Sequence, residues 1–285
     1  MKLSVMTLPL LPMPDIPGLK QESKPKKPVS LVDIYGQIKA AGVNDLDISS
    51  IDFQFGGEVV VLSALEEADL QCACYLAFIE APRPSPEGQA QAVSEGKRAV
   101  DQTLRLGADV MMFVPAGYQE AVAVMSRQEL ADSFAEVLRP VTAYAAERGV
   151  TVAIEDAPHR EFPMCAEAEL RYLLETVPGL KLVYDSGNML WAGEDPVEYY
   201  DHLAEYVAHA HLKEVGRAPD GTLTECCPGN GSVDFQRIFR HMRRHGFEGF
   251  MAIELPPDFS AEESIGERVH QAVNYLTPLL ERSIP

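Results

Sequence analysis

Residues 148–156 read Arg-Gly-Val-Thr-Val-Ala-Ile-Glu-Asp, and the rest of the chain repeats their plan. The glycine ends a predicted helix, because glycine readily adopts the left-handed conformation that closes a helix. A short apolar, β-branched run follows and ends in two carboxylates, Glu155 and Asp156. The same punctuation of helix, glycine and strand recurs at Gly42, Gly107, Gly179 and Gly246. Repeated units of this kind predict a parallel sheet covered by helices.

Eight strand-like runs are spaced along the 285 residues, and this number predicts a closed (β/α)8 TIM barrel with outer helices. The runs are 3–8, 45–49, 70–78, 109–114, 151–155, 181–185, 208–213 and 250–255. A doubly wound open sheet is the alternative, but it usually carries a glycine-rich turn after the first strand. This chain has Leu11-Pro12-Met13-Pro14 there. We expect helix caps at Ser30, at Ser126 and at Ser232 or Asp234.

The expected domain organisation is one TIM-barrel domain over residues 1–285. Residues 13–29 interrupt the rhythm, because they are rich in proline and lysine. They would follow the first strand at the catalytic end of the barrel. We expect a mobile loop there, either simply solvated or acting as a lid over the site.

Composition excludes several classes of protein. The formal net charge of −19 opposes binding to nucleic acids and to anionic membranes. No run of about 18 apolar residues exists, and the N-terminus reads as a strand rather than a signal peptide. The five cysteines form neither a disulfide framework nor a zinc-knuckle pattern, and Cys72 and Cys74 lie in an apolar run. We therefore expect a cytoplasmic protein with neither a nucleic-acid nor a membrane partner.

The last four predicted strands each end in a side chain that can bind a metal ion. These are Glu155, Asp185, His211 and Glu254. In a TIM barrel the carboxyl ends of the strands meet at one mouth, so these four side chains should converge. Three carboxylates and one imidazole suit a divalent ion such as Mn²⁺, Mg²⁺ or Co²⁺, with Zn²⁺ as a further candidate.

These strand ends resemble the xylose isomerase-like barrels, a sugar phosphate isomerase/epimerase group that includes ketose 3-epimerases, inosose dehydratases and endonuclease IV. The resembling segments are 152–156, 182–188, 209–213, 229–235 and 246–254. The resemblance implies one divalent metal ion, Mn²⁺ by preference, held by Glu155, Asp185, His211 and Glu254. It also implies that Glu155 and Glu254 are the catalytic acid and base, and that Arg217 contacts substrate. One departure is Asn188, where many members have a histidine; an amide can bind a hydroxyl but cannot shuttle a proton.

Further residues near these strand ends are candidates for binding substrate. They are His159 in the loop after Glu155, Lys213 two residues after His211, and Trp191, which follows Asn188. Several neighbours read as structural or surface groups. We expect His209 to be a packed, hydrogen-bonded barrel histidine, Glu214 to be solvated, and Cys226-Cys227 to lie in the loop after the seventh strand. The run Pro228-Gly229-Asn230-Gly231 can present backbone amides to an anion.

The function implied by this resemblance is an epimerase or isomerase acting on a sugar or sugar derivative. The metal would polarise a carbonyl and stabilise an enediolate, while the two glutamates move the proton. A metal-dependent dehydratase acting on a cyclic polyol ketone, of the inosose or dehydroshikimate type, is the alternative. An endonuclease IV-like enzyme is disfavoured by the charge and by the absence of any histidine before His159. A non-catalytic sugar-binding barrel is disfavoured by the complete ligand set. The substrate is thus a small sugar or polyol ketone, and relatives suggest a homodimer or homotetramer.

Overall fold

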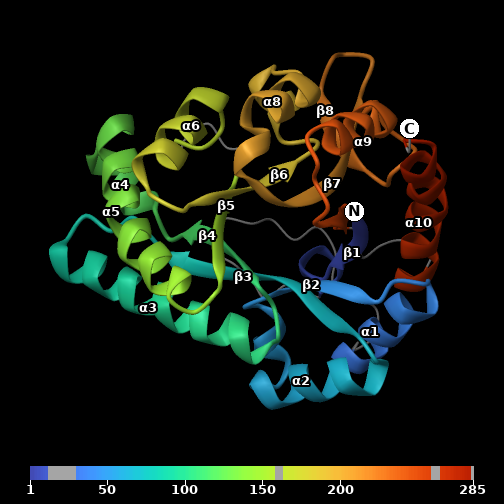
Figure 1. The fold of residues 1–285 in the computed structure, drawn as a ribbon, viewed down its shortest axis with the longest axis horizontal. Helices are drawn as coiled ribbons and strands as arrows, with labels where there is room; N and C mark the ends of the chain where they lie inside the picture. Colours follow the sequence, from blue (N-terminus) through green and yellow to red (C-terminus); the bar gives the residue numbers. More distant parts are fainter. Residues whose placement is uncertain (12–29, 158–162, 258–263, 284–285) are drawn as a thin grey trace.

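A computed structural model describes residues 1–11, 30–157, 163–257 and 264–283. Within these ranges, eight parallel strands pair in a closed ring (Figure 1). The predicted (β/α)8 barrel is therefore confirmed. The barrel strands are β1 (Lys2–Met6), β2 (Asp45–Ser49), β3 (Gln71–Glu80), β4 (Val110–Ala116), β5 (Thr151–Glu155), β6 (Lys181–Asp185), β7 (Val207–Arg217) and β9 (Phe250–Glu254). The predicted loop at residues 13–29 lies outside the described residues.

Helices surround the barrel on its outside (Figure 1). They are α1 (Leu31–Ala40), α2 (Gly57–Ala68), α3 (Pro86–Arg105), α4 (Gln119–Val124), α5 (Arg127–Ala146), α6 (Glu167–Thr176), α7 (Met189–Ala192), α8 (Pro196–Leu203), α9 (Phe235–Arg244) and α10 (Ile265–Arg282). Short 3-10 turns span Leu8–Leu10, Asp52–Phe55 and Ala204–Tyr206.

Local sequence signals set the ends of these helices as predicted. Ser30 accepts the Asp33 amide at the start of α1, Ser126 and Glu129 form a reciprocal capping box on α5, and Asp234 caps α9. The five glycines that punctuate the sequence all have positive φ, between 73° and 90°. An L side chain is strained in that conformation, so glycine is the residue that turns the chain from helix to strand there.

The apolar core has two parts. The larger part fills the space between the barrel and the helices, as each strand directs alternate side chains outward. A smaller cluster includes Cys74, Ala153, Val183 and Ala252. The last three of these each precede a predicted metal ligand by two positions, so they share its inward face and form the floor beneath the site.

The structure departs from the prediction at the end of β7. The predicted strand ends at residue 213, whereas β7 continues to Arg217 and forms an antiparallel hairpin with β8 (Leu223–Cys226). In this hairpin Val215 pairs with Glu225. Cys226 therefore lies on a strand rather than in a loop. The hairpin supplies backbone hydrogen-bond partners to residues 214–217, and this pairing lets β7 extend beyond the barrel.

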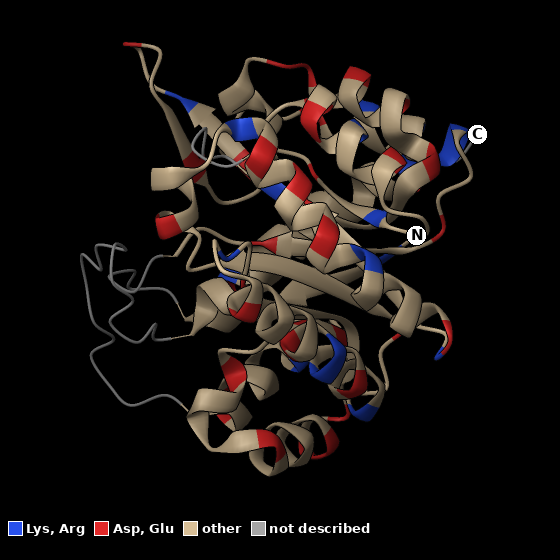
Figure 2. Ribbon diagram, turned by 90° about the vertical axis from the view of Figure 1, so that its left-hand side faces the viewer, with Lys and Arg blue, Asp and Glu red and all other residues tan. Residues whose placement is uncertain are grey.

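The acidic residues that give the chain its negative net charge lie on several of its outer helices. Figure 2 shows acidic positions on several outer helices of one face, with basic positions interspersed. Much of this charge is paired locally, as between Arg127 of α5 and Glu169 of α6. In the described part of the chain, no helix has the length and apolarity needed to cross a bilayer.

Candidate metal centre

The four predicted ligands come together at the carboxyl end of the barrel. Glu155, Asp185, His211 and Glu254 close β5, β6, the barrel part of β7 and β9, and each offers a ligand atom within 4.8 Å of the others. The register explains the convergence. Asp185 pairs with His211 on the neighbouring strand, and Lys213 pairs with Glu254. Side chains at paired positions of neighbouring strands point to the same face of the sheet.

The hydrogen bonding of the cluster fits a cation. Asp185 Oδ1 accepts the amides of Gly187 and Asn188, but Asp185 Oδ2 and Glu254 Oε2 are buried and find no hydrogen-bond partner among the described residues. His211 Nδ1 contacts Glu155 Oε1 and lies 3.8 Å from Glu254 Oε2. Buried acceptors that face one another are costly unless a proton or a metal ion lies between them. The donor set of three carboxylates and one imidazole suits a divalent ion.

The same crowding perturbs the acid–base behaviour of the ligands. Burial, reinforced by the charges of Asp185 and Glu155, raises the pKa of Glu254 to about 8 despite the opposing charge of Lys213. Burial also raises the pKa of Asp185. Burial opposes the charged form of His211, but the carboxylates of Glu155 and Asp47 outweigh it and raise its pKa well above the usual value. A divalent ion that enters such a site displaces the protons that these groups otherwise retain.

Lys213 is the buried cation beside the cluster. Its ammonium lies 2.9 Å from Glu254 Oε1 and donates to Asn188 Oδ1 at 3.0 Å. Asn188 is 2% exposed, and its amide nitrogen donates to the Asp156 carbonyl at 2.8 Å. The side chain predicted to bind substrate thus holds the lysine against the cluster. Asp185 Oδ2 lies 4.0 Å from the ammonium. A third carboxylate, Glu225 of β8, lies 3.8 Å from it because the hairpin folds back toward it.

The remaining predicted substrate residues are placed less centrally. Arg217 is exposed at the end of β7 and donates to the Gly221 carbonyl within the hairpin. Trp191 lies in α7, half-buried against the core. His159 lies outside the described residues. His209 is a buried barrel histidine bonded to Asp47, as its sequence position suggested.

Two features escaped the sequence-based prediction. Asp47 of β2 is fully buried between His209 and His211. The signal for its burial in the sequence was an acidic residue flanked by the apolar Leu46 and Ile48. Glu214, expected in solvent, is 1% exposed. Its carboxylate accepts the backbone amides of Val215, Gly229 and Val233.

Glu214 also changes the interpretation of the glycine-rich loop after β8. The amides of Gly229 and Val233, which an external anion would need, bind this internal carboxylate. The Asn230 amide donates to the Cys227 carbonyl, and that of Ser232 donates to the Val215 carbonyl. The loop therefore uses these four donors to close on itself.

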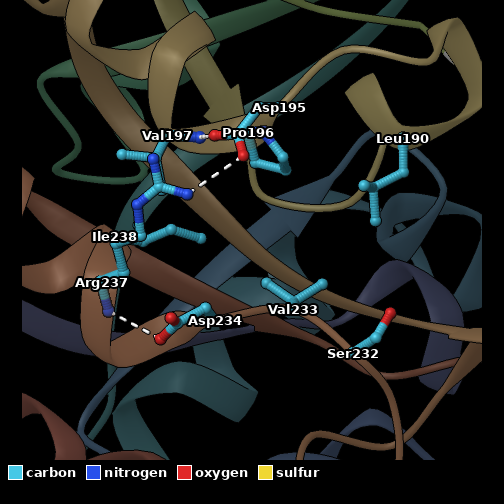
Figure 3. Close-up of a pocket in the computed structure, with 9 residues that line it drawn as sticks. All are labelled: Leu190, Asp195, Pro196, Val197, Ser232, Val233, Asp234, Arg237 and Ile238. Carbon is cyan, nitrogen blue, oxygen red and sulfur yellow. Dashed lines mark hydrogen bonds and ion pairs between the residues drawn. The ribbon is translucent and has the colours of Figure 1, made fainter.

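A cavity of about 240 Å³ lies to the side of the cluster, between the first turns of α8 and α9. Figure 3 shows its lining and the ion pair of Arg237 with Asp195, 3.1 Å apart, at its edge. None of the four candidate ligands lines it.

Comparison with known proteins agrees with this fold. A curated inosose dehydratase of Clostridium botulinum (strain Eklund 17B / Type B) is 30% identical over 91 residues, which are 27% of this chain. The matched part spans 30% of that relative's length. The solved structure of the IOLI protein with a binding zinc atom superposes with a TM-score of 0.78 at 17% identity, over 100% of this chain and 99% of that one. A D-allulose 3-epimerase from Methylomonas sp. superposes with a TM-score of 0.72 at 14% identity, over 98% of both chains. These two superpositions establish the fold.

A family model described as "Xylose isomerase-like TIM barrel" matches residues 43–272. The match includes seven of the eight barrel strands and all four candidate ligands. The chain belongs to the xylose isomerase-like TIM barrel family.

Proposed function

We propose that this protein is a divalent-metal-dependent enzyme that removes a proton from the carbon beside the carbonyl of a polyhydroxylated ketone. The observation that carries the proposal is the cluster of Glu155, Asp185, His211 and Glu254, whose ligand atoms lie within 4.8 Å of one another. Two of its buried carboxylate oxygens have no hydrogen-bond partner in the part of the chain that the structure describes. Mn²⁺ is the ion we propose, because three carboxylates and one imidazole form a hard-to-borderline donor set. A bound ion would polarise the substrate carbonyl and stabilise the negative charge that develops on its oxygen.

The exposure of the ligands suggests how their roles divide. The side chains of Asp185 and His211 are 0% exposed, whereas those of Glu155 and Glu254 are 17% and 14% exposed. The two glutamates can therefore touch a substrate. The other two candidate ligands are too deeply buried to touch it and can only hold the metal ion. In the proposed reaction one glutamate removes the proton and the other returns one.

The charged neighbours of the cluster complete this proposal. Lys213 is positioned by Asn188 to place a positive charge near the substrate oxygen as negative charge builds there. The ammonium also lies 2.9 Å from Glu254 Oε1. The resemblance adds Arg217, and sequence position adds His159 and Trp191, as proposed contacts for the rest of the substrate.

Epimerisation or isomerisation of a sugar is the first form of this reaction. Glu155 and Glu254 come from β5 and β9, which are not neighbours in the sheet, and His211 lies between their carboxylates. This arrangement supports removal of a proton at one side of the substrate and its return at another. The second form is dehydration of a cyclic polyol ketone, and the inosose dehydratase relative favours it.

One experiment in D₂O separates these forms. Metal-stripped protein, reloaded with MnCl₂, is incubated with a panel of ketoses and with inosose, and products are followed by NMR and ultraviolet absorbance. Epimerase activity gives a deuterated sugar of new configuration without an absorbing product. Dehydratase activity gives a conjugated, ultraviolet-absorbing ketone. Glu254→Gln should abolish either product, and Glu205→Gln, an exposed glutamate in a 3-10 turn, serves as the matched control. Manganese-loaded protein that exchanges no substrate hydrogen across the panel refutes the proposed reaction.

A further inference from the structure

Asp47 is a buried acid that the proposed reaction does not use. It lies on β2, a strand that contributes none of the four candidate ligands, and its side chain is 0% exposed. It faces the imidazoles of His209 and His211, which stand on the same face of β7 with ring centroids 5.6 Å apart. A buried carboxylate is costly, so its place beneath the metal centre needs a physical reason.

The groups around Asp47 are all hydrogen-bond donors. Oδ1 accepts the Ser4 hydroxyl at 2.9 Å, and Oδ2 lies 2.6 Å from His209 Nε2. The same Oδ2 lies 3.3 Å from His211 Nε2, a buried atom that makes no hydrogen bond of good geometry within the described ranges. A carboxylate can only accept a hydrogen bond, so it favours hydrogen on the imidazole nitrogens that face it.

This arrangement has a consequence for the opposite edge of His211. An imidazole ligand with its hydrogen on Nε2 presents a lone pair at Nδ1. Nδ1 is the atom that contacts Glu155 and faces Glu254 at 3.8 Å. A hydrogen held on one ring nitrogen therefore leaves the other nitrogen free for a metal ion.

We infer that Asp47 is a positioning residue for the metal centre: its carboxylate holds the hydrogen of His211 on Nε2 and keeps the Nδ1 lone pair directed at the other ligands. This inference rests on the proposed metal site. His209 also bonds to Oδ2 of Asp47, and the Ser4 hydroxyl bonds to Oδ1. Partners of this kind typically change metal affinity by about 10–100-fold when they are removed.

The test compares Asp47→Asn with Ser4→Ala, a control that removes one bond to Asp47 without touching His211. Both variants and the wild type are stripped of metal and titrated with MnCl₂ by calorimetry, and their Co²⁺ complexes are examined by absorption spectroscopy. We expect Asp47→Asn to weaken Mn²⁺ binding about 10–100-fold and to shift the Co²⁺ ligand-field bands. Ser4→Ala, which removes only the bond to Oδ1 of Asp47, should weaken Mn²⁺ binding and shift the bands less than Asp47→Asn does. A folded Asp47→Asn protein with wild-type affinity and spectrum overturns the inference.

Other outcomes are equally decisive. If the wild type binds no divalent ion, the proposed function fails together with the inference, and this failure is visible before any variant is made. If the wild type binds two ions and Asp47→Asn binds one, Asp47 is itself a ligand, with Cys74 and His209 as its companions, and the positioning role is wrong. If Asp47→Asn does not fold, long-range ¹H–¹⁵N spectra of the Zn²⁺-loaded wild type decide. Hydrogen on Nε2 of His211 supports the inference, and hydrogen on Nδ1 refutes it.

Discussion

Glu214→Ala should destabilise the protein by about 2–6 kcal/mol, because it removes the acceptor of three backbone amides. Gly229 is exposed, so water can replace the carboxylate at its amide. Val215 and Val233 are buried, and each amide left without a partner costs about 1–3 kcal/mol. The sum over those two amides sets the expected magnitude. Glu214→Gln keeps an acceptor oxygen and should lose less.

The measurement is urea unfolding followed by the fluorescence of Trp191, the single tryptophan of the chain. Glu205→Ala is the control, since Glu205 is an exposed glutamate in the 3-10 turn Ala204–Tyr206. It should change the free energy of unfolding by less than about 0.5 kcal/mol. If Glu214→Ala is no less stable than this control, the carboxylate does not hold the loop and our reasoning about its amides is wrong.

Three further predictions follow from individual contacts. Asp185→Asn should weaken Mn²⁺ binding by at least about 100-fold by calorimetry, and retention of wild-type affinity would exclude Asp185 as a ligand. Asp195→Ala should cost about 1 kcal/mol at pH 7, because Asp195 caps α8. Burial raises the pKa of Asp195, but the Glu198 and Val197 amides and the Arg237 charge outweigh it and lower that pKa overall. The difference in unfolding free energy should therefore be full above about pH 5 and shrink as the pH falls below about 4; a difference that stays constant in acid would contradict this assignment. Gly231→Ala should lose about 1–3 kcal/mol in the urea assay, because its Cβ would lie 2.6 Å from the Val215 carbonyl oxygen. Gly36→Ala, in an open position of α1, should instead stabilise, and equal losses would rule out the clash.

Most of the fold and the membership of the ligand cluster could be predicted from local sequence. A glycine after each of five helices ends the helix through its own backbone freedom, whatever surrounds it. The period-two alternation of β5 and β9 directs Glu155 and Glu254 inward together with Ala153 and Ala252. Barrel closure then brings the strand ends to one mouth, so these ligands could be named without coordinates.

The surroundings of the cluster depended on contacts between residues far apart in the chain. The Asp47 carboxylate meets the His209 imidazole across 162 residues, and Asn188 meets Lys213 across 25. Glu214 looks like a surface acid in sequence, yet the loop that returns at Val233 encloses it.

Backbone preference and side-chain alternation fix the order of strands and helices, the inward faces of the strands and the candidate ligands, and both can be read from local sequence. Contacts made in the folded chain set the second partner of each candidate ligand, the extension of β7 into a hairpin and the burial of Glu214. These contacts could not be predicted, because a hydrogen bond depends on distance and direction between two groups, and a linear pattern specifies only one group at a time.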